Sequence, residues 1–517
     1  MSLLSQPAGS TESADRDFRP KLGLFDATML IAGTMIGSGI FIVSADIARD
    51  VGSSGWLMAV WLVTGVVTIA GGLAYAELAS MMPRAGGQYI FLREAFSPLW
   101  GFLYGWTVLL VIQTGSIAAV AVAFAKFLGV LVPQLGTGPE AILYQLHFAQ
   151  PLKLFLPLPW LNEPLKIFER DQFTITSGQL VAVAIILLLT GLNCRGVKEG
   201  SLIQNIFGLA KTLGLLVLIV AGLFVAANAT ALQANTNDLW NGIYQTKRYQ
   251  EVSKLVHFPA LGIALMVAGG AMVGSLFSAD AWNNVTFSAG EVKQPERTVP
   301  LALILGPTLV IVLYLLANLA YLAALTMPEI QDAPDDRVAT AVMEKASPGL
   351  GVTFIAIAVM ISTFGCVNGM ILMGARLYYA MARDGLFFEP VGRLNDQRVP
   401  ANGLIVQGVW SVLLVFSGTY SELLDYVIFA ALLFYALTVA GLFVLRVRRP
   451  EWPRPVRAFG YPVVPALYMI FCTLLMLDLL IVRPEYTWPG LILVVAGIPV
   501  YFLWRIFGRK VGAADTH

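Results

Sequence analysis

Two long apolar stretches of this chain are each interrupted near the middle by small and polar residues. The first runs from about Leu24 to Ala48 and is broken by Gly33-Thr-Met-Ile-Gly-Ser-Gly39. The second runs from about Ala260 to Gly290 and is broken by Phe277-Ser-Ala-Asp-Ala-Trp-Asn283. Backbone released from a helix at membrane depth is tolerated only where protein or a water-filled cavity satisfies it. Matching breaks in two halves of a membrane protein therefore indicate a ligand site near the bilayer midplane.

The composition is that of an integral membrane protein. The 517 residues are 57% hydrophobic and only 13% charged, with a mean hydropathy of +0.74, whereas soluble domains are about one quarter charged. Apolar runs of about 20 residues, long enough to cross a bilayer, recur along the whole chain. We predict an all-α fold with twelve spans, at about 24–48, 54–82, 100–133, 178–193, 200–226, 260–290, 299–326, 351–381, 403–418, 421–447, 462–482 and 487–508.

The positions of the two breaks predict an internal repeat. Spans one to five and six to ten each open with a broken helix, which indicates two five-helix repeats of opposite orientation. The repeats cover about 24–226 and 260–447, and two further helices cover about 462–508. Residues 21–510 form one transmembrane domain between a disordered tail at 1–20 and a short tail at 511–517. We expect the long loop at about 134–177 to be a packed outer loop.

The distribution of basic residues predicts the orientation. Most of the 33 Lys and Arg residues fall in the two tails and in the loops that lie on the same side of the membrane as the N-terminus. By the positive-inside rule, both termini are cytoplasmic. We expect a multi-pass protein of the plasma membrane, specifically a bacterial inner membrane. In the loop regions on that side, Glu77 is expected to pair with Arg84 or Arg93.

Several classes of function are not indicated. The net charge of +1 gives no reason to expect a nucleic-acid partner. The three cysteines and three histidines have no metal-site spacing, so neither a metal nor another cofactor is predicted. No cluster of nucleophile, acid and base recurs at helical spacing, which argues against an enzyme.

The breaks have opposite electrostatic poles. The outer half of span one begins near Gly37. The amides of Gly37, Ser38, Gly39 and Ile40 lack helical acceptors at the positive end of a dipole, which favours a carboxylate. The first half of span six ends near Phe277 with unpaired carbonyl groups, which favours an ammonium group. An α-amino acid carries both charges. The alternative is a Gly-x-x-x-Gly packing face at Gly33 and Gly37, but the second break favours a site.

Lys211 is a basic residue within an apolar span, where it is costly unless it faces the protein interior. It shares a helical face with other small or polar residues, which we expect to face span one: Ser201, Gln204, Asn205, Gly208 and Thr212. The alternative is a side chain that snorkels to the membrane surface.

Several motifs together resemble the amino acid–polyamine–organocation superfamily, specifically its L-type amino acid transporter branch. They cover about residues 20–450 and are Gly33-Thr-Met-Ile-Gly-Ser-Gly-Ile-Phe41, Tyr75-Ala-Glu-Leu78, Pro83-Arg-Ala-Gly-Gly-Gln-Tyr89, Asn193-Cys-Arg-Gly-Val197, Lys211, Trp282-Asn283, Glu291 with Pro295, Phe364-Gly-Cys-Val-Asn-Gly369 and Ala382-Arg-Asp-Gly385. The resemblance implies the inverted-repeat fold of the bacterial leucine transporter, with alternating access.

The resemblance also implies roles for particular residues. Phe277 is implied as a gate above the substrate, and Cys366 and Met370 lie near the side-chain pocket. Members of the family with a lysine at the position of Lys211 do not use sodium, so its ammonium group can stand in for a coupling cation or exchange a proton. Ala279 and Ala281 depart from the more usual Tyr and Gly. No outer-loop cysteine is available to form a disulfide with an accessory subunit, so we expect the chain to work without such a subunit.

These observations predict a secondary transporter that exchanges neutral L-amino acids without sodium. The substrate-site candidates are Met35, Gly37, Ser38, Gly39, Phe277, Ser278, Ala279, Asp280, Cys366 and Met370, with Lys211 in coupling. Asp280 is expected to support the broken backbone, pair with Asn283 or receive the substrate ammonium group. The alternatives are a proton-coupled symporter, a cationic amino acid carrier if Asp280 points into the pocket, and a nutrient receptor that does not transport.

Overall fold

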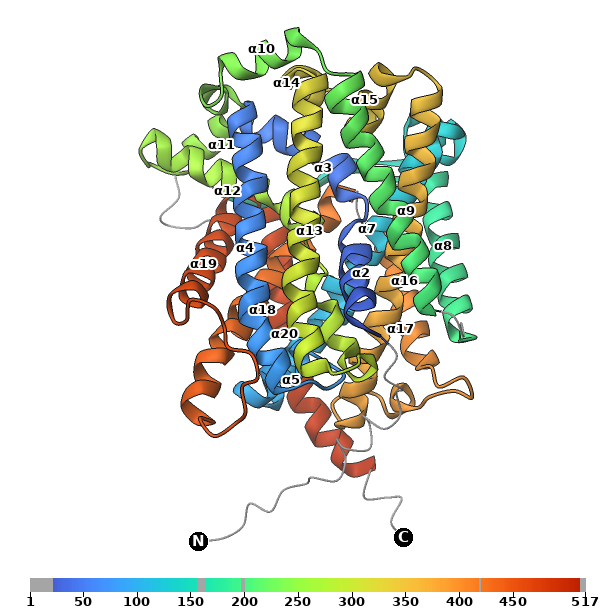
Figure 1. The fold of residues 1–517 in the computed structure, drawn as a ribbon, viewed down its shortest axis with the longest axis vertical. Helices are drawn as coiled ribbons and strands as arrows, with labels where there is room; N and C mark the ends of the chain where they lie inside the picture. The colour runs from blue at the N-terminus through green and yellow to red at the C-terminus, as the bar shows by residue number, and fades with distance from the viewer. Residues whose placement is uncertain (1–21, 157–163, 197–199, 418–419, 512–517) are drawn as a thin grey trace.

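A computed structural model shows a bundle of long helices, and it describes residues 22–156, 164–196, 200–417 and 420–511 (Figure 1). The predicted tail at 1–20 and nearly all of the tail at 511–517 lie outside the described residues. Helix α2 begins and helix α20 ends at the same end of the bundle, the lower end in Figure 1. The short helices α10, α14 and α15 cover the opposite, upper end.

All twelve predicted spans fall on helices. In chain order these are α2 (Leu24–Met35) with α3 (Gly39–Val51), α4 (Ser54–Met81), α6 (Pro98–Thr107) with η1 (Val108–Ile112) and α7 (Gln113–Leu131), α8 (Ser177–Cys194), α9 (Gly200–Val220) with η4 (Ala221–Val225), α12 (Ala260–Ser278) with η6 (Trp282–Glu291), α13 (Pro295–Ala324), α16 (Leu350–Arg383), α17 (Ala401–Val415), α18 (Tyr420–Arg448), α19 (Val463–Val482) and α20 (Pro484–Val511). The label η marks 3-10 or π turns.

The length and hydropathy of each helix show whether it could cross a membrane. Among the described residues, 10 helices are long and apolar enough to cross a membrane, and the bent pair α2–α3 raises the number to 11. Helix α17 is apolar but shorter than these. The helical membrane fold is therefore confirmed, whereas the count of twelve and the repeat boundaries stay predictions.

Shorter elements connect the spans. They are α5 (Gln88–Ala95), η2 (Pro133–Leu135), η3 (Pro139–Ala141), α10 (Ala229–Asn237), η5 (Asn241–Gln245), α11 (Lys247–Leu255), α14 (Met327–Gln331), η7 (Pro334–Asp336), α15 (Val338–Ala346) and η8 (Glu389–Gly392). Local hydrogen bonds fix where helices begin. At the start of α8, the Thr176 hydroxyl accepts from the Gln179 amide while the Gln179 side chain accepts from the Thr176 amide, and this capping box satisfies two amides that lack helical partners.

The loop expected at 134–177 contains the one sheet in the described part of the chain. Strands β1 (Ile142–Leu156) and β2 (Leu165–Thr176) pair antiparallel, with irregular register near His147 and Leu154. Strand β2 packs against α20. This hairpin was not predicted from the sequence, although Tyr144-Gln-Leu-His-Phe148 alternates between apolar and polar residues with the period of a strand.

Ion pairs join helices at the lower end of the bundle. Glu77 on α4 is fully buried and lies 2.5 Å from Arg446 on α18 and 3.3 Å from Arg454. The expected partners Arg84 and Arg93 were therefore wrong: Arg93 pairs with Asp384 at the end of α16. Pairing between residues so distant in sequence depends on the packing of α4 against α18, which neighbouring charges do not reveal.

At the upper end, Asp336 ties α3 to α7. Its carboxylate lies 2.7 Å from Arg49 on α3 and 2.8 Å from Lys126 on α7. Burial raises the pKa of Asp336, but the charges and hydrogen bonds of Lys126 and Arg49 outweigh burial and hold this pKa below its ordinary value. The carboxylate therefore stabilises the fold while it is ionised.

We predict that Asp336→Asn lowers stability at neutral pH by about 1 kcal/mol, a value reduced for partial exposure of the pair. Asn tolerates the left-handed backbone at this position (φ +60°), so the change removes the charge alone. Because the folded pKa is depressed, the loss should be complete above about pH 4 and disappear as pH falls through the folded value. Thermal melting of the purified protein across pH measures it.

The control for this prediction is Asp335→Asn. Asp335 is also left-handed (φ +50°), and its one ion pair to a described residue is with Arg337, at 3.1 Å. Its side chain is 39% exposed, against 26% for Asp336, so its loss should be smaller. A difference between wild type and Asp336→Asn that stays constant down to acid pH would contradict the assignment.

Candidate substrate site

The first break separates α2 from α3 as predicted. Helix α2 ends at Met35, α3 begins at Gly39, and their axes differ by 44°. Ile36 has a non-helical backbone (φ −73°, ψ 83°) and donates its amide to the Ala32 carbonyl. The chain thus leaves one helix and starts another within the buried centre of the bundle.

Side chains from three other helices satisfy the carbonyl groups at this break. The donors are Lys211 Nζ on α9 to Gly33 O (2.5 Å), Cys366 Sγ on α16 to Thr34 O (3.1 Å), the Tyr314 hydroxyl on α13 to Met35 O (2.9 Å) and the Ser362 hydroxyl on α16 to Ile36 O (2.9 Å). A buried carbonyl without a partner costs about 1–3 kcal/mol. These contacts therefore hold open a backbone that would otherwise be driven into a continuous helix.

Of the four amides predicted to be available on the other side of the break, that of Gly37 is already paired and the other three remain available. Gly37 N donates to Met35 O, and Phe41 N donates to Ser38 O. Ser38 is the N-cap residue of α3, and Gly39 and Ile40 begin the helix, where first-turn amides have no helical acceptors. Among the described residues no other backbone acceptor is recorded for these three amides. The first turn of α3 therefore presents N–H groups with the positive end of a dipole.

The second break lies at Ala279–Ala281. Helix α12 ends at Ser278, and a 3-10 helix, η6, continues from Trp282. Ala281 adopts a left-handed backbone (φ 66°), which costs a non-glycine residue about 1–2 kcal/mol. Such strain persists only where the surrounding structure fixes it, and it is concentrated at functional sites.

The two breaks touch. A Cβ atom built on Gly39 would lie 2.0 Å from Ser278 Oγ and 3.0 Å from Ser278 Cα, so only glycine fits there. The Tyr314 hydroxyl bridges the breaks by contacting Met35 O (2.9 Å) and Ser278 O (3.0 Å). The positive start of α3 and the negative end of α12 therefore meet in one place. The carbonyl groups predicted to be unpaired at the end of α12 have donors, because Phe277 O accepts from the Asp280 amide at 3.1 Å and Ser278 O accepts from Tyr314.

Two aromatic rings cover this junction from above. Phe277 and Tyr420 pack edge to face with centroids 6.2 Å apart, and the Tyr420 hydroxyl lies 3.0 Å from Ser38 Oγ. A cavity of about 700 Å³ opens above them and reaches Gly274 on α12 and Leu424 on α18. These two residues are about one helical turn from Phe277 and Tyr420. Phe277 thus lies between the upper cavity and the breaks.

The remaining candidates divide into two groups. Met35, Gly37, Ser38, Ala279 and Cys366 are buried around the junction, and a Cβ on Gly37 would lie 3.1 Å from Cys366 Sγ. Met370 and Asp280 instead line a small cavity of about 20 Å³ on the other side of the second break.

Asp280 has a partner that the sequence did not indicate. The Tyr435 hydroxyl on α18 donates to its carboxylate. The Ala281 amide also donates to the Asp280 carboxylate, which is the support of the broken backbone that was expected. The alternative partner, Asn283, donates to Gln88 Oε1 at 2.8 Å, and no hydrogen bond between it and Asp280 is found among the described residues. Tyr314, Ser362 and Tyr420 also lie at the site and were not among the predicted residues. A polar side chain within an apolar span was the available signal for each.

Lys211 faces span one as predicted. Its side chain is buried and donates to Gly33 O. Gly208, one turn earlier, lies against α2, since a Cβ built there would be 3.6 Å from Met29 O. The side chains of Ser201, Gln204 and Asn205 lie outside what is described. The snorkelling alternative is wrong because the ammonium group ends at the break and not at a membrane surface.

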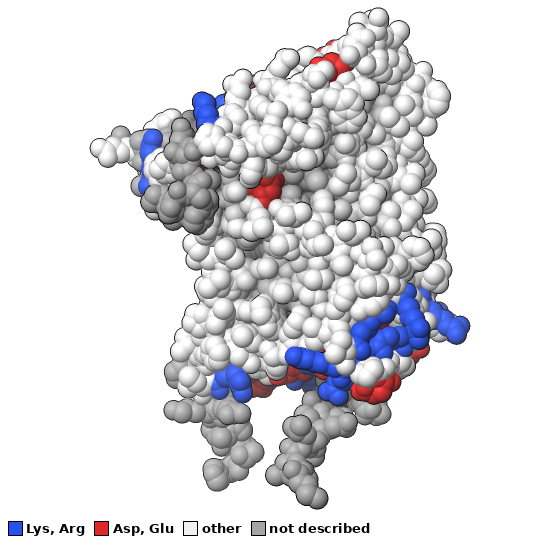
Figure 2. Space-filling model, turned by 90° about the vertical axis from the view of Figure 1, so that its left-hand side faces the viewer, with Lys and Arg blue, Asp and Glu red and all other residues white. Residues whose placement is uncertain are grey.

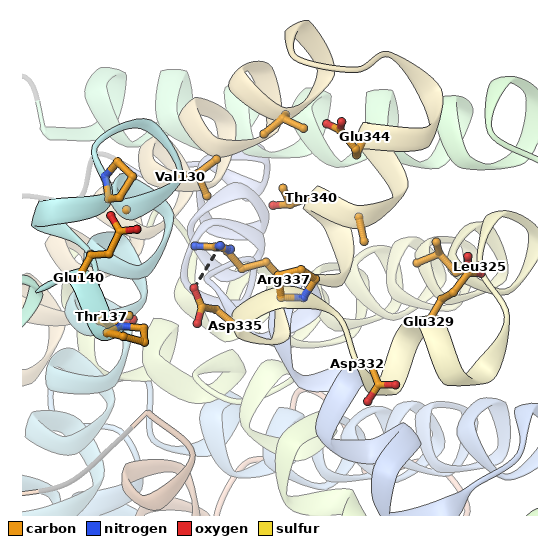
Figure 3. A pocket seen from close by; sticks show the side chains of 18 of the residues that line it. Val130, Thr137, Glu140, Leu325, Glu329, Asp332, Asp335, Arg337, Thr340 and Glu344 are labelled. Atoms are coloured by element: carbon orange, nitrogen blue, oxygen red, sulfur yellow. Dashed lines mark ion pairs between the residues drawn. The ribbon is translucent and has the colours of Figure 1, made fainter.

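A separate hollow of about 870 Å³ lies at the upper end of the molecule (Figure 3). Figure 3 shows Glu140, Glu329 and Glu344 around it, and Asp335 paired with Arg337. None of the predicted substrate-site residues lines this hollow. Its size therefore does not identify it as the predicted site.

Comparison with known sequences decides the family. A profile of the amino acid permease family matches residues 22–502. The chain belongs to the amino acid permease family. The permease is 29% identical to the large neutral amino acids transporter small subunit 2 of Mus musculus over 495 residues, which cover 95% of this chain and 82% of that protein. The resemblance to the L-type branch is thereby confirmed.

Two further relatives agree. The permease is 30% identical to the large neutral amino acids transporter small subunit 2 of Rattus norvegicus over 495 residues, 95% of this chain and 82% of the relative. It is 28% identical to the b(0,+)-type amino acid transporter 1 of Mus musculus over 499 residues, 96% of this chain and 90% of the relative. The chain is a transporter of the permease family, which argues against an enzyme.

We predict that Tyr314→Phe lowers the transport rate of the permease while the protein still folds. The change removes one hydroxyl that serves both Met35 O and Ser278 O, so both breaks lose a donor. The stability loss should be about 1–3 kcal/mol, measured by thermal melting beside uptake into proteoliposomes.

The matched control is Tyr321→Phe. Tyr321 is equally buried on the same helix and, among the described residues, donates only to Ile40 O, at 3.0 Å, outside the gap between the breaks. Equal transport by the two variants would show that bridging the breaks has no special importance.

Proposed function

We propose that this permease exchanges L-amino acids across the membrane without sodium and that neutral side chains fit its pocket. The observation that carries the proposal is the contact between the amide end of α3 and the carbonyl end of α12. The substrate carboxylate is assigned to the amides of Ser38 and Gly39, where dipole and unpaired N–H groups favour an anion. The α-ammonium group is assigned to the end of α12 near Phe277 and Ser278.

The pocket chemistry supports neutral side chains. Met35, Ala279, Cys366 and Met370 are apolar or polarisable and buried. A thioether or a thiol adapts to side chains of different shape. We assign these residues to contacts with the substrate side chain.

Lys211 supports independence from sodium. Its ammonium group contacts the carbonyl end of α2, where a cation is stabilised by the helix dipole. A charge attached to α9 cannot leave with the substrate. We therefore assign Lys211 the role that a bound metal cation would otherwise have.

Alternating access requires the two sides of the substrate site, above and below the breaks, to be closed by different contacts. The upper cavity extends to within a turn of Phe277, which we assign as the gate on that side. Below the breaks, Gln88 Nε2 contacts Thr438 at 3.0 Å and Gln88 Oε1 accepts from Asn283. Substrate release toward the lower end requires these contacts to separate.

Charge distribution supports cytoplasmic termini. Figure 2 shows Lys and Arg side chains along the lower edge of one face, below a broad zone with almost no charge. Helix α2 begins and α20 ends at this lower end (Figure 1), so we place both termini in the cytoplasm. The assignment to a bacterial inner membrane stays a prediction.

We also propose that the chain works without a disulfide-linked subunit. The relative in Mus musculus is named a small subunit. In this chain Cys366 and Cys472 are buried within helices, and Cys194 ends α8. Cys194 is partly buried and its thiol contacts the Ala401 carbonyl at 3.8 Å, so none of the three is presented for a bond to another chain.

The purified protein in proteoliposomes tests the function by counterflow. We expect labelled leucine to enter only liposomes preloaded with unlabelled amino acid, equally well in sodium and in choline buffer. Uptake into empty liposomes that needs an imposed pH gradient would replace exchange with proton symport. Binding of leucine without any counterflow would show a receptor.

We predict that Lys211→Ala abolishes most counterflow while the protein still folds. The change leaves Gly33 O without its donor and removes the positive charge from the end of α2. The control is Thr212→Val, which removes a hydroxyl that, within the described part of the chain, is bonded only to Gly208 O on the same helix. Counterflow by Lys211→Ala at the wild-type rate would reject the role of the lysine.

A further inference from the structure

We propose that the loop between α18 and α19 binds the headgroups of anionic phospholipids at the membrane surface on the lower side of the bundle. The loop covers residues 449–462, between the last residue of α18 and the first of α19. The inference goes beyond the proposed transport function, because the loop contains none of the residues assigned to the substrate. It rests on the apolar face of α19, on the charges of the loop and on the contacts that hold the loop in place.

Helix α19 has a continuous apolar face that the rest of the bundle does not cover. The helix is long and apolar enough to cross a membrane, and it packs against α4, α12 and α18. The uncovered residues follow helical spacing and are each more than half exposed: Val463, Leu467, Ile470, Leu474 and Leu477. Phe459 comes four residues before Val463 and is 71% exposed. The lipid-facing side of the helix therefore extends onto the loop.

The loop and the end of α18 are strongly basic. Residues 446–457 include one acidic residue, Glu451, and five arginines: Arg446, Arg448, Arg449, Arg454 and Arg457. Figure 2 faces the side of the molecule on which α19 lies in Figure 1, and it shows Lys and Arg side chains along the lower edge, below a broad surface with almost no charge. Basic residues immediately beside a membrane helix attract anionic lipid headgroups.

Two of the five arginines hold the loop against the bundle. Arg446 and Arg454 lie at the buried carboxylate of Glu77 on α4, at 2.5 and 3.3 Å. The same carboxylate accepts from the Ala458 amide at 2.7 Å, and Arg454 also donates to the Arg449 carbonyl at 2.9 Å. These contacts fix the backbone near both ends of the loop. The side chains on its outer surface are therefore presented from an ordered backbone.

Arg449 and Arg457 are the arginines available to a ligand. Both are exposed, and no ion pair found among the described residues includes either of them. Arg448 is exposed as well, but it donates to Ala95 O at 3.3 Å. The guanidinium group of Arg449 lies 5.6 Å from the ring centroid of Trp452, and tryptophan is enriched where headgroups meet acyl chains. A guanidinium group matches the geometry of a phosphate.

The combination of apolar and basic groups favours a lipid over a soluble anion. Phe459 and the uncovered face of α19 contact the acyl chains, and the two arginines bind the phosphate group to which those chains are attached. A soluble anion would use the arginines alone, and contacts between exposed charges are weak. A zwitterionic lipid has the same chains without a net charge, so the arginines favour a lipid that is negatively charged.

Photocrosslinking in proteoliposomes tests the inference at the loop itself. The probe is phosphatidylglycerol with a photoreactive acyl chain, unlabelled phosphatidylglycerol or phosphatidylcholine competes with it, and mass spectrometry identifies the labelled peptides. We expect label on the peptide that contains Phe459 and stronger competition by phosphatidylglycerol. Because each basic residue near an anionic surface contributes about five-fold in affinity, Arg449→Gln/Arg457→Gln should lower this preference by about 25-fold.

Matched variants separate the effect of charge from that of apolar contact. Arg393 is exposed in the loop that follows α16 at the same end of the bundle, but it already pairs with Glu389 at 2.5 Å. Arg393→Gln should therefore keep the wild-type preference. Phe459→Ser should lower labelling by both lipids and leave the preference unchanged. If the double variant does not melt like the wild type, Arg457→Gln alone replaces it and should lower the preference about five-fold.

Several outcomes would overturn the inference. Equal competition by the two lipids in the wild type would do so, as would an unchanged preference in the double variant. Soluble glycerol phosphate that competes as well as phosphatidylglycerol would show a site for free anions instead of lipid. All of these results are measured by lipid labelling and not by transport, so they do not depend on whether the proposed exchange of amino acids is correct.

Discussion

The structure depends on how the carbonyl groups at the end of α2 are satisfied. Four consecutive carbonyls, from Gly33 to Ile36, accept from side chains of α9, α13 and α16. In apolar surroundings each unpaired carbonyl would otherwise cost free energy, and a continuous helix would be the alternative of lowest free energy. The break therefore exists because distant helices supply donors. These donors also fix where α2 stands relative to the rest of the bundle.

Satisfying the carbonyls while leaving the amides available creates an asymmetric site. The side chains at the break donate and therefore complete the acceptor end of α2, but they offer nothing to the N–H groups that begin α3. Those amides keep their preference for an anion. In a continuous helix these C=O and N–H groups would be buried in helical hydrogen bonds. In a loop where both kinds of group had partners, the site would have no preference for an anion over a cation. The contact of Gly39 with Ser278 then brings the end of α12 beside this anion site.

Much of this arrangement could be predicted from the sequence because it depends on local pattern. Gly37-Ser-Gly39 and the apolar flanks indicate a broken span, and Lys211 in an apolar helix indicates an inward face. Tyr314 and Tyr435 could not be assigned in the same way, since a tyrosine in a membrane helix is as compatible with ordinary packing. Their roles depend on which residues the fold brings opposite them, 279 residues away for Met35 and 155 for Asp280.

The hairpin and the Glu77 pairs were missed for related reasons. The alternation at Tyr144–Phe148 was a local strand signal, but a strand outside the bundle conflicts with the helical pattern of the rest of the chain. For Glu77, charges nearby in the sequence suggested Arg84 and Arg93, whereas helix packing places Arg446 and Arg454 at its carboxylate. Proximity in sequence is a poor guide to ion pairs in a bundle of long helices, because the residues that pack together come from helices far apart in the chain.

Lys211 and Asp280 hold the two breaks in different ways. Lys211 donates from α9 to Gly33 O, so a positive charge attached to another helix completes the end of α2. Asp280 accepts from the Tyr435 hydroxyl and from the Ala281 amide, so its carboxylate supports the left-handed backbone of the second break. The first break therefore depends on donors from distant helices, whereas the second is stabilised in part by an acid within the break itself.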